Sequence, residues 1–499
     1  MSPSTSTTPC ALGIDLGTGS VKTVLLDAAG HQLAGASAPV RVSSPHAGWA
    51  ESEPEDWWLS VRTAVHELVD IIDGRQTQVG AIGLSGQMHG VVLTSASGKA
   101  LRPAILHLDR RAQNDLDAYR ALPAEIRSVL ANPLVPGMAG PLLHWLASNE
   151  PDVLSRAEWA LQPKDWLRLR LIGSAGSEPS DASGTLLFDL ARSSWAEPVI
   201  AGLGLPSRLF PPIGQSGAVA GDLDAATASE LGLLPGTPVA FGCADTAAAL
   251  VGTGLSEVGP VQLTVGSAAQ IVTIRVRPGP DPGLRYHVFA NTLPGQWYAL
   301  AAVQVAGVAI SWALGAFAAS WDEGYEALAR SPLGANGALF VPHLAGARSP
   351  SMDPAAGAGF VGIELHHERA DMLRAVFEGV AFSIAEAAAS LPEFADAPVL
   401  HLAGGGTLHA KWRQLLCDVL GKKLLVVENP NASARGAALL GGQAAGIIGK
   451  ITEEPLITRE VEPDPGSHAY LSQLFERWGQ AAAAISQPSQ VRPGNQVMK

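Results

Sequence analysis

The sequence predicts an α/β fold in two domains, on three observations. The chain has 499 residues, which is more than one hydrophobic core usually supports. Strand-like and helix-like segments alternate through its first half. A strand, glycine turn and strand order begins again near Gly259 and echoes that of residues 12–26. We therefore expect one domain over residues 1–255 and a second over 256–486, with a flexible tail at 487–499.

The first elements follow from apolar runs and the turn residues between them. Three short strands joined by tight turns open the chain, and a long amphipathic helix follows. Two further strand-like runs and two helical segments come next. The expected elements are strands at Ala11–Asp15, Val21–Leu26, His31–Val40, Val79–Leu84 and Gly90–Leu93, and helices at Pro54–Ile72, Gln113–Ala121 and Gly140–Ser148.

The second half is read in the same way. Leu255–Pro260 is short and rich in turn residues, so it is the expected domain boundary. Ala301–Ser320 is apolar enough to suggest a membrane span, but Gln304 and its many small residues favour a buried helix. The other expected elements are strands at Val261–Val265, Ala268–Val276 and Val399–Leu402, and helices at Trp412–Val419 and Tyr470–Ile485.

Composition excludes several classes of function. Hydrophobic residues make up 47% of the chain and charged residues only 16%, which is typical of a compact globular enzyme. The net charge of −13, with no Lys/Arg cluster, argues against a nucleic-acid partner. Only three cysteines occur, at wide spacing, so neither a disulfide framework nor a zinc site is indicated. With no signal peptide visible, we expect a cytoplasmic protein without a membrane partner. A homodimer remains open.

The turn Asp15-Leu16-Gly17-Thr18-Gly19-Ser20-Val21-Lys22 is a candidate phosphate site. Its glycines let the backbone approach a phosphate, its amides and hydroxyls can donate hydrogen bonds, and Lys22 adds positive charge. An ordinary hairpin turn is the alternative. Asp15 directly precedes the turn and could hold Mg²⁺ through water, because magnesium keeps most of its waters and takes few carboxylates.

Three further segments are candidates for chemistry. Asp245 follows an apolar run and precedes an Ala-rich stretch, so it is either a helix cap or a general base for a phosphate acceptor. Met88 and His89 follow a strand, at the kind of edge where α/β sheets bind ligands, although a packed core histidine is the more common case. Gly404-Gly405-Gly406 follows a strand and precedes a helix, so it is a flexible turn or a second nucleotide contact.

These motifs together resemble the xylulokinases of the FGGY carbohydrate kinase family over roughly residues 10 to 446. The Met88-His89 pair is the most specific, because glycerol kinases carry other residues there. The matching segments are Gly13-Ile14-Asp15-Leu16-Gly17-Thr18, Gly48-Trp49-Ala50-Glu51, Ser85–Gly90, Pro163-Lys164-Asp165-Trp166-Leu167, Ser180-Asp181-Ala182-Ser183-Gly184-Thr185, Asp245 and Trp412-Arg413-Gln414.

The resemblance implies a duplicated actin-like, ribonuclease-H-like fold with a cleft between the domains. It also implies that ATP phosphorylates D-xylulose to D-xylulose 5-phosphate. Asp245 would accept the proton of the 5-hydroxyl, while Met88, His89 and Trp49 would contact the sugar. The expected nucleotide contacts are Thr18, Gly19, Ser20, Lys22, Gly266, Ser267, Gly307, Gly404, Gly405 and His409.

Three positions depart from the family pattern. Ala347 stands where an acidic residue is common, and Gly357 where a basic one is common. His409 replaces a smaller polar residue. Two alternatives therefore stay open: a kinase of another ketose or polyol, and a non-catalytic sugar sensor on the same fold. A sensor would not need Asp245 and usually carries an added DNA-binding segment.

Overall fold

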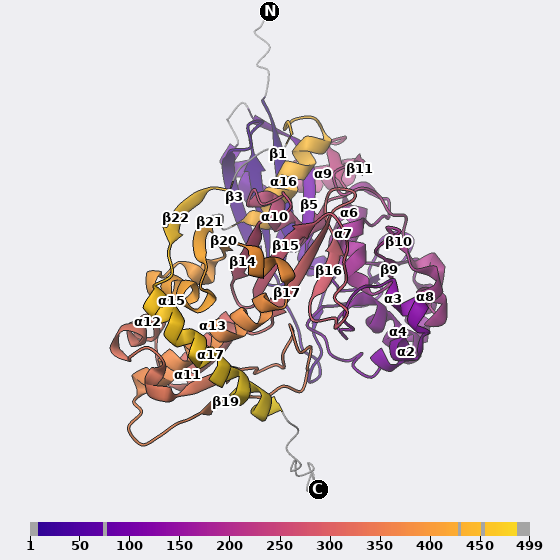
Figure 1. The fold of residues 1–499 in the computed structure, drawn as a ribbon. Helices are drawn as coiled ribbons and strands as arrows, with labels where there is room; N and C mark the ends of the chain where they lie inside the picture. Colours follow the sequence, from indigo (N-terminus) through magenta and orange to yellow (C-terminus); the bar gives the residue numbers. More distant parts are fainter. Residues whose placement is uncertain (1–7, 73–76, 428–430, 451–454, 487–499) are drawn as a thin grey trace, which may run out of the picture.

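The protein is described from a computed structural model, which covers residues 8–72, 77–427, 431–450 and 455–486. Two mixed β-sheets form its centre (Figure 1). The tail expected at 487–499 lies outside the described residues. The strands of the first sheet are β1 (Thr8–Leu16), β2 (Ser20–Leu26), β3 (Gln32–Pro39), β5 (Thr77–Gly86), β11 (Val219–Asp222), β12 (Pro238–Ala240) and β13 (Cys243–Ala244). Those of the second sheet are β14 (Val261–Val265), β15 (Ala269–Arg275), β16 (His287–Ala290), β17 (Trp297–Val303), β20 (Val399–Ala403), β21 (Lys423–Val427) and β22 (Ile457–Val461).

The two sheets share one topology. In the first sheet β1 pairs antiparallel with β2, β2 pairs antiparallel with β3, and β1 lies parallel to β5. In the second sheet β14 pairs antiparallel with β15, β15 pairs antiparallel with β17, and β14 lies parallel to β20. The echo of residues 12–26 near Gly259 is therefore a structural duplication, and the two-domain α/β expectation is confirmed.

The remaining strands form small two-stranded sheets, and helices pack around both large sheets. The small strands are β4 (Glu51–Ser52), β6 (Val92–Thr94), β7 (Ala104–Ile105), β8 (Trp159–Leu161), β9 (Phe188–Asp189), β10 (Ser194–Trp195), β18 (Leu339–Pro342) and β19 (Ala358–Val361). The helices are α1 (Pro54–Ile72), α2 (Leu116–Ala121), α3 (Ala124–Ser128), α4 (Ala139–Asn149), α5 (Pro151–Arg156), α6 (Pro163–Ile172), α7 (Pro179–Ala182), α8 (Glu197–Gly202), α9 (Ala225–Leu231), α10 (Asp245–Gly252), α11 (Gly307–Ala316), α12 (Trp321–Arg330), α13 (Arg369–Ala389), α14 (Pro392–Asp396), α15 (Ala410–Leu420), α16 (Ala432–Ala444) and α17 (Pro465–Ser486).

One expected element is wrong. Ala301–Ser320 is not a single buried helix, because β17 runs to Val303 and α11 begins only at Gly307. Val308 and Trp312 on α11 are 46% and 47% exposed. Small residues made the segment apolar on average without making it uniformly buried. Within the described part of the chain, no helix is both long and apolar enough to cross a membrane.

Two helices that are distant in the sequence cross at the centre of the molecule. α16, near the end of the chain, packs against β1 and β5 of the first sheet and against α10 (Figure 1). Their contact requires glycine: a Cβ at Gly252 would lie 1.9 Å from the carbonyl oxygen of Ala432, and one at Gly436 would lie 1.9 Å from that of Ala248. Real Cβ atoms do not approach so closely, so backbone packs directly on backbone here. The crossing joins the start of α10, where Asp245 lies, to a helix from the second half of the chain.

Candidate functional site

Three strands of the first sheet end together and carry the chemical residues. β1, β5 and β13 are parallel, and Asp15 and Cys243 both lie opposite Ser85 in register. The carboxyl ends of parallel strands meet at one edge of a sheet, which is where α/β folds bind ligands. The structure thus brings Asp15, Met88, His89 and Asp245 to the same edge, although 230 residues of sequence separate the first from the last.

The two carboxylates at this edge act on one another. Asp15 is 8% exposed, and the Ser85 hydroxyl donates a 2.6 Å hydrogen bond to its Oδ1. Burial raises the pKa of Asp15, while Ser85 and the charge of Lys22 oppose this rise. Asp245 begins α10, and its Oδ1 accepts a 2.6 Å hydrogen bond from the Thr246 amide. Burial and the charge of Asp15 raise the pKa of Asp245 to about 7. A carboxyl group with that pKa can accept a proton at neutral pH.

This carboxylate pair also fits Mg²⁺. In the described part of the chain no group of three or more His, Cys, Asp or Glu side chains could hold a metal ion. Magnesium does not need such a group, because it binds through one or two carboxylates, with water and substrate phosphate completing its six ligands. Two neighbouring carboxylates whose charges repel would be stabilised by a cation between them.

His89 is fixed in one orientation. Its backbone has φ of 76° and its amide donates a 2.8 Å hydrogen bond to Oε1 of Gln162. Nδ1 lies 2.7 Å from the carbonyl oxygen of Gly184, which can only accept, so Nδ1 carries the proton and Nε2 remains an acceptor. Burial lowers the pKa of His89 to about 3, and the Gly184 hydrogen bond opposes this effect. His89 is therefore a neutral ring with a defined acceptor.

Met88 packs beneath His89 against the second sheet. Met88 is 6% exposed, and its sulfur accepts a 3.5 Å hydrogen bond from the Tyr298 hydroxyl of β17. A Cβ at Gly184 would lie 2.8 Å from Nδ1 of His89 and 2.9 Å from Cε of Met88. Glycine at position 184 is therefore necessary for this packing.

Residues 162–184 hold in place the segments that carry His89 and Asp245. The sequence-based site prediction did not include these residues. The Gln162 side chain also donates to the backbone oxygen of Asp181. Ser180 Oγ accepts a 2.9 Å hydrogen bond from the Ala244 amide, directly before Asp245, and donates to Glu178 at 2.8 Å. Behind them Lys164, which is fully buried, lies 3.5 Å from Asp181. The sequence did contain a signal for this segment, because Pro163–Leu167 places charged residues inside an otherwise apolar helix.

Trp49 lies in a separate cluster of aromatic and charged residues. The Arg111 guanidinium lies 3.5 Å from the centre of its ring, and Trp145 packs edge-on at 5.4 Å. Arg111 also binds Glu51 at 2.7 Å and Asp109 at 2.8 Å. This network fixes the loop that carries Trp49. A sugar contact by Trp49 remains a prediction.

The expected phosphate turn of the first sheet has the compact form anticipated. The Gly17 amide donates a 3.1 Å hydrogen bond to the Ser20 oxygen, and the Thr18 hydroxyl donates to Oε1 of Gln87 at 3.0 Å. Gly19 is exposed at the tip of the turn. Lys22 on β2 lies opposite Asp15 in register. The turn is thus tied to the segment that carries Met88 and His89.

The candidate nucleotide residues of the second sheet also come together. The Gly307 amide donates a 3.0 Å hydrogen bond to the Gly266 oxygen, and the Ala306 amide donates to the Ser267 oxygen at 2.9 Å. A Cβ at Gly307 would lie 2.5 Å from the Gly266 oxygen. Gly404 has φ of 99°, and a Cβ there would lie 2.4 Å from the Val265 oxygen. The N-terminus of α11 and the loop after β20 therefore meet the β14–β15 turn.

Gly405 and His409 lie just beyond this contact. Gly405 is exposed, and no atom would lie within 4 Å of a Cβ placed on it. His409 precedes α15 and stacks flat on Tyr325 of α12, with 3.8 Å between ring centres and 3° between ring planes. Burial lowers the pKa of His409, so its ring is neutral at pH 7. A flat neutral surface at this place could meet a planar base.

A carboxylate pair beside glycine turns on two duplicated sheets defines the class of the protein, which is a phosphotransferase of the actin-like, ribonuclease-H-like fold. The family models agree. Residues 10–252 match the N-terminal domain of the FGGY family of carbohydrate kinases, and residues 269–445 match its C-terminal domain. The chain belongs to the FGGY family of carbohydrate kinases.

Individual relatives are similar over most of their length. A xylulose kinase of Bacillus subtilis (strain 168) is 30% identical over 89% of this chain and 89% of its own. A xylulose kinase of Escherichia coli (strain K12) is 32% identical over 83% and 85%. A crystal structure of a xyloylose kinase from Brucella ovis superposes with a TM-score of 0.88 at 30% identity, covering 95% of this chain and 99% of the other.

Proposed function

We propose that this chain transfers the γ-phosphoryl group of ATP to the 5-hydroxyl of D-xylulose. The single observation that carries the chemistry is Asp245, which begins a helix beside Asp15 and has a pKa raised to about 7. The relatives that are 30% and 32% identical are xylulose kinases, and this supports the choice of sugar. A sensor without activity would have no use for this carboxylate pair.

The reaction follows from the positions of the side chains. Asp245 accepts the proton of the sugar 5-hydroxyl as the oxygen of that hydroxyl forms a bond to the γ-phosphorus of ATP. The bond between the γ-phosphorus and the β–γ bridging oxygen breaks, which releases ADP. Mg²⁺ held by Asp15, through water or directly, would neutralise charge on the phosphate oxygens. His89, through Nε2, accepts a hydrogen bond from a sugar hydroxyl. The glycine turns at Gly17–Ser20 and Gly266–Ser267 offer amides to phosphate oxygens.

Two wider proposals concern the setting of the enzyme. We propose a reducing cytoplasm as its compartment, and the support is that Cys10, Cys243 and Cys417 are all free and buried. A homodimer also remains a proposal.

The substrate assignment is tested by ADP release across a panel of sugars. D-xylulose should exceed glycerol and D-ribulose in kcat/KM by at least roughly 10²-fold, because a site built to bind particular hydroxyls leaves polar groups unpaired with the wrong sugar. If glycerol or D-ribulose proves the better substrate, D-xylulose is the wrong assignment and the kinase assignment survives. If no sugar in the panel releases ADP, the kinase proposal itself fails.

The pH dependence of kcat/KM should report the ionisation of the Asp245 carboxyl group. A general base must be ionised, and the pKa of Asp245 is about 7, so kcat/KM should fall about tenfold per pH unit below pH 7 and level off above it. Asp15→Asn removes a charge that raises the pKa of Asp245. In this variant the decline of the residual kcat/KM on acidification should therefore begin at a lower pH than in the wild-type enzyme. A flat wild-type profile between pH 5.5 and 8 would contradict this assignment.

A further inference from the structure

Arg348 brings an uncompensated positive charge to the junction of the two domains. Burial lowers the pKa of its guanidinium, and no carboxylate contributes to that pKa. Among the described residues the structure gives this guanidinium no ion pair and no hydrogen-bond partner. Asp109, which lines the same pocket, is already bound by Arg111 at 2.8 Å and by the Ala50 amide at 2.7 Å. The preceding residue, Ala347, offers no charge. A half-buried guanidinium with unused donors is costly unless a ligand supplies acceptors.

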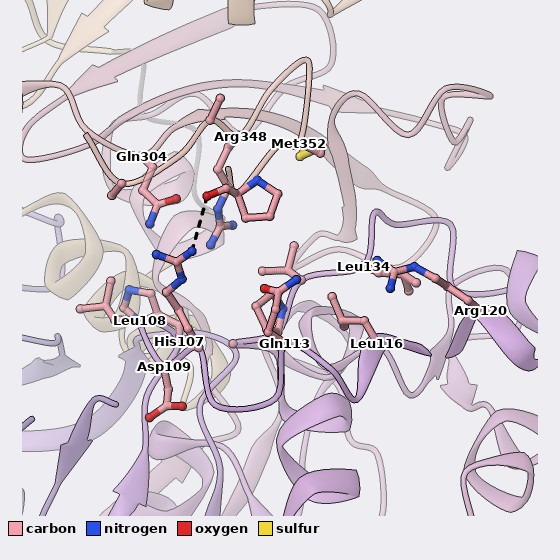
Figure 2. Close-up of a pocket in the computed structure, with 17 residues that line it drawn as sticks. His107, Leu108, Asp109, Gln113, Leu116, Arg120, Leu134, Gln304, Arg348 and Met352 are labelled. Atoms are coloured by element: carbon pink, nitrogen blue, oxygen red, sulfur yellow. Dashed lines mark hydrogen bonds between the residues drawn. The ribbon is translucent and has the colours of Figure 1, made fainter. Parts of the chain in front are cut away.

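The backbone holds Arg348 beside the edge of the second sheet. The Ser349 amide donates a 3.0 Å hydrogen bond to the Ala302 oxygen on β17, and the Ala302 amide donates to Ser349 Oγ at 3.1 Å. β17 pairs with β16, where His287 lies opposite Leu300. Figure 2 shows Gln304, Arg348 and Met352 on one side of the pocket, with His107, Leu108 and Gln113 facing them from the first half of the chain.

The charge of Arg348 acts on three neutral imidazoles. The charge of Arg348 contributes to the lowered pKa of His89, His107 and His287, and burial is the largest cause in each. His287 is 1% exposed, and neither of its ring nitrogens has a hydrogen-bond partner among the residues that the structure describes. Within the same residues, Nδ1 of His107 is also buried without a partner. His287 offers a donor and an acceptor, and Arg348 offers unused donors, a combination that suits a small ligand with several oxygens.

A row of aromatic rings connects this cluster to the reacting edge. Tyr298, which contacts Met88, lies 5.4 Å from Phe289, and His287 stacks on Phe289 at 5.5 Å with 9° between the planes. His89 lies 5.8 Å from the same phenylalanine. The charge of Asp245 helps to raise the pKa of Tyr298, at one end of the row, and the charge of Arg348 helps to lower the pKa of His287, at the other. A short sugar chain whose last hydroxyl faces Asp245 would direct its first carbons toward Arg348.

We propose that Arg348 and His287 bind the C1 hydroxyl and C2 carbonyl of the ketose, at the end opposite the phosphorylated hydroxyl. The guanidinium donates to both the C2 carbonyl oxygen and the C1 hydroxyl oxygen, and the C1 hydroxyl in turn donates to a ring nitrogen of His287. His287 lies on β16 of the second sheet, and Arg348 lies in the loop that is hydrogen-bonded to β17 through Ser349, whereas His89 and Asp245 follow β5 and β13 of the first sheet. The sugar is therefore held from both domains. This inference rests on the proposed xylulose kinase function.

The test compares D-xylulose with 1-deoxy-D-xylulose, which lacks only the C1 hydroxyl. For the wild-type enzyme the ratio of the two kcat/KM values should be roughly 10 to 100, as expected for a hydrogen bond in a site with a charged partner. In Arg348→Met and His287→Phe the ratio should fall toward one, mainly because the KM for D-xylulose rises. Arg110→Met is the matched control, because Arg110 lines the same pocket but is exposed and its guanidinium donates a weak 3.5 Å hydrogen bond to the Pro354 oxygen. Its ratio should stay at the wild-type value.

The outcomes separate this inference from the function on which it rests. A ratio near one in the wild-type enzyme overturns the proposed binding of the C1 hydroxyl without any variant. An unchanged ratio in both Arg348→Met and His287→Phe overturns it as well, provided that these variants still phosphorylate D-xylulose. Failure of the wild-type enzyme to phosphorylate D-xylulose overturns the proposed function instead. Arg348→Lys keeps the charge and should retain part of the ratio, so it provides a milder variant if Arg348→Met does not fold.

Discussion

Asp245→Asn should lower kcat with D-xylulose by about 10²- to 10⁴-fold while the fold is retained. The amide keeps the size of the side chain and can still accept a hydrogen bond from the Thr246 amide, but it cannot take the proton of the sugar hydroxyl. The loss should appear in kcat, because Asp245 acts mainly in the transition state. Single-turnover ADP release would measure it, with circular dichroism to check folding.

A matched control for this substitution is Asp152→Asn. Asp152 also lies in the first turn of a helix, but it is exposed on α5 and outside the site. Its turnover should equal that of the wild-type enzyme. A folded Asp245→Asn protein with near-normal turnover would remove Asp245 from the role of general base.

His89→Ala should abolish most of the preference for D-xylulose. The ring is held by Gly184 and kept neutral, so its Nε2 offers one acceptor in a fixed place. Alanine removes that acceptor and leaves space that water can occupy. The ratio of kcat/KM for D-xylulose over D-ribulose should fall from at least roughly 10² to within about tenfold of one. Steady-state kinetics with both sugars gives this ratio.

His31→Ala is the control for the histidine variant, because His31 is 80% exposed at a turn and belongs to no site. It should keep the full preference. An unchanged ratio in His89→Ala, together with normal KM for D-xylulose, would show that other residues choose the sugar.

Local sequence patterns predicted the sheets and helices well where apolar residues repeat strongly. The helix at Pro54–Ile72 has the predicted bounds, and the three opening strands occur with ends shifted by a few residues. The failure at Ala301–Ser320 has a clear cause. Alanine and glycine suit both a strand end and a helix, so composition there could not locate the break between Val303 and Gly307.

The candidate residues next to glycine turns were also accessible from the sequence. Asp15 lies at the end of a strand, Asp245 and Gly404 each follow one, and the ends of parallel strands must meet at one edge of their sheet. The pKa of Asp245 was not accessible, since it depends on burial and on a carboxylate 230 positions away. The same holds for Lys164 and Asp181, whose role depends on their contact inside the core.

The sequence by itself determined the two duplicated α/β units, the strand-end positions of the reactive residues and the resemblance to sugar kinases. Those properties arise from short-range periodicity and from motifs within a few residues of one another. Only the tertiary structure decided that α16 returns to pack on the first sheet, that Gly184 fixes His89, and that the charge of Arg348 acts on His287. Each depends on contacts between segments far apart in the chain, which exist only once the two sheets have packed together.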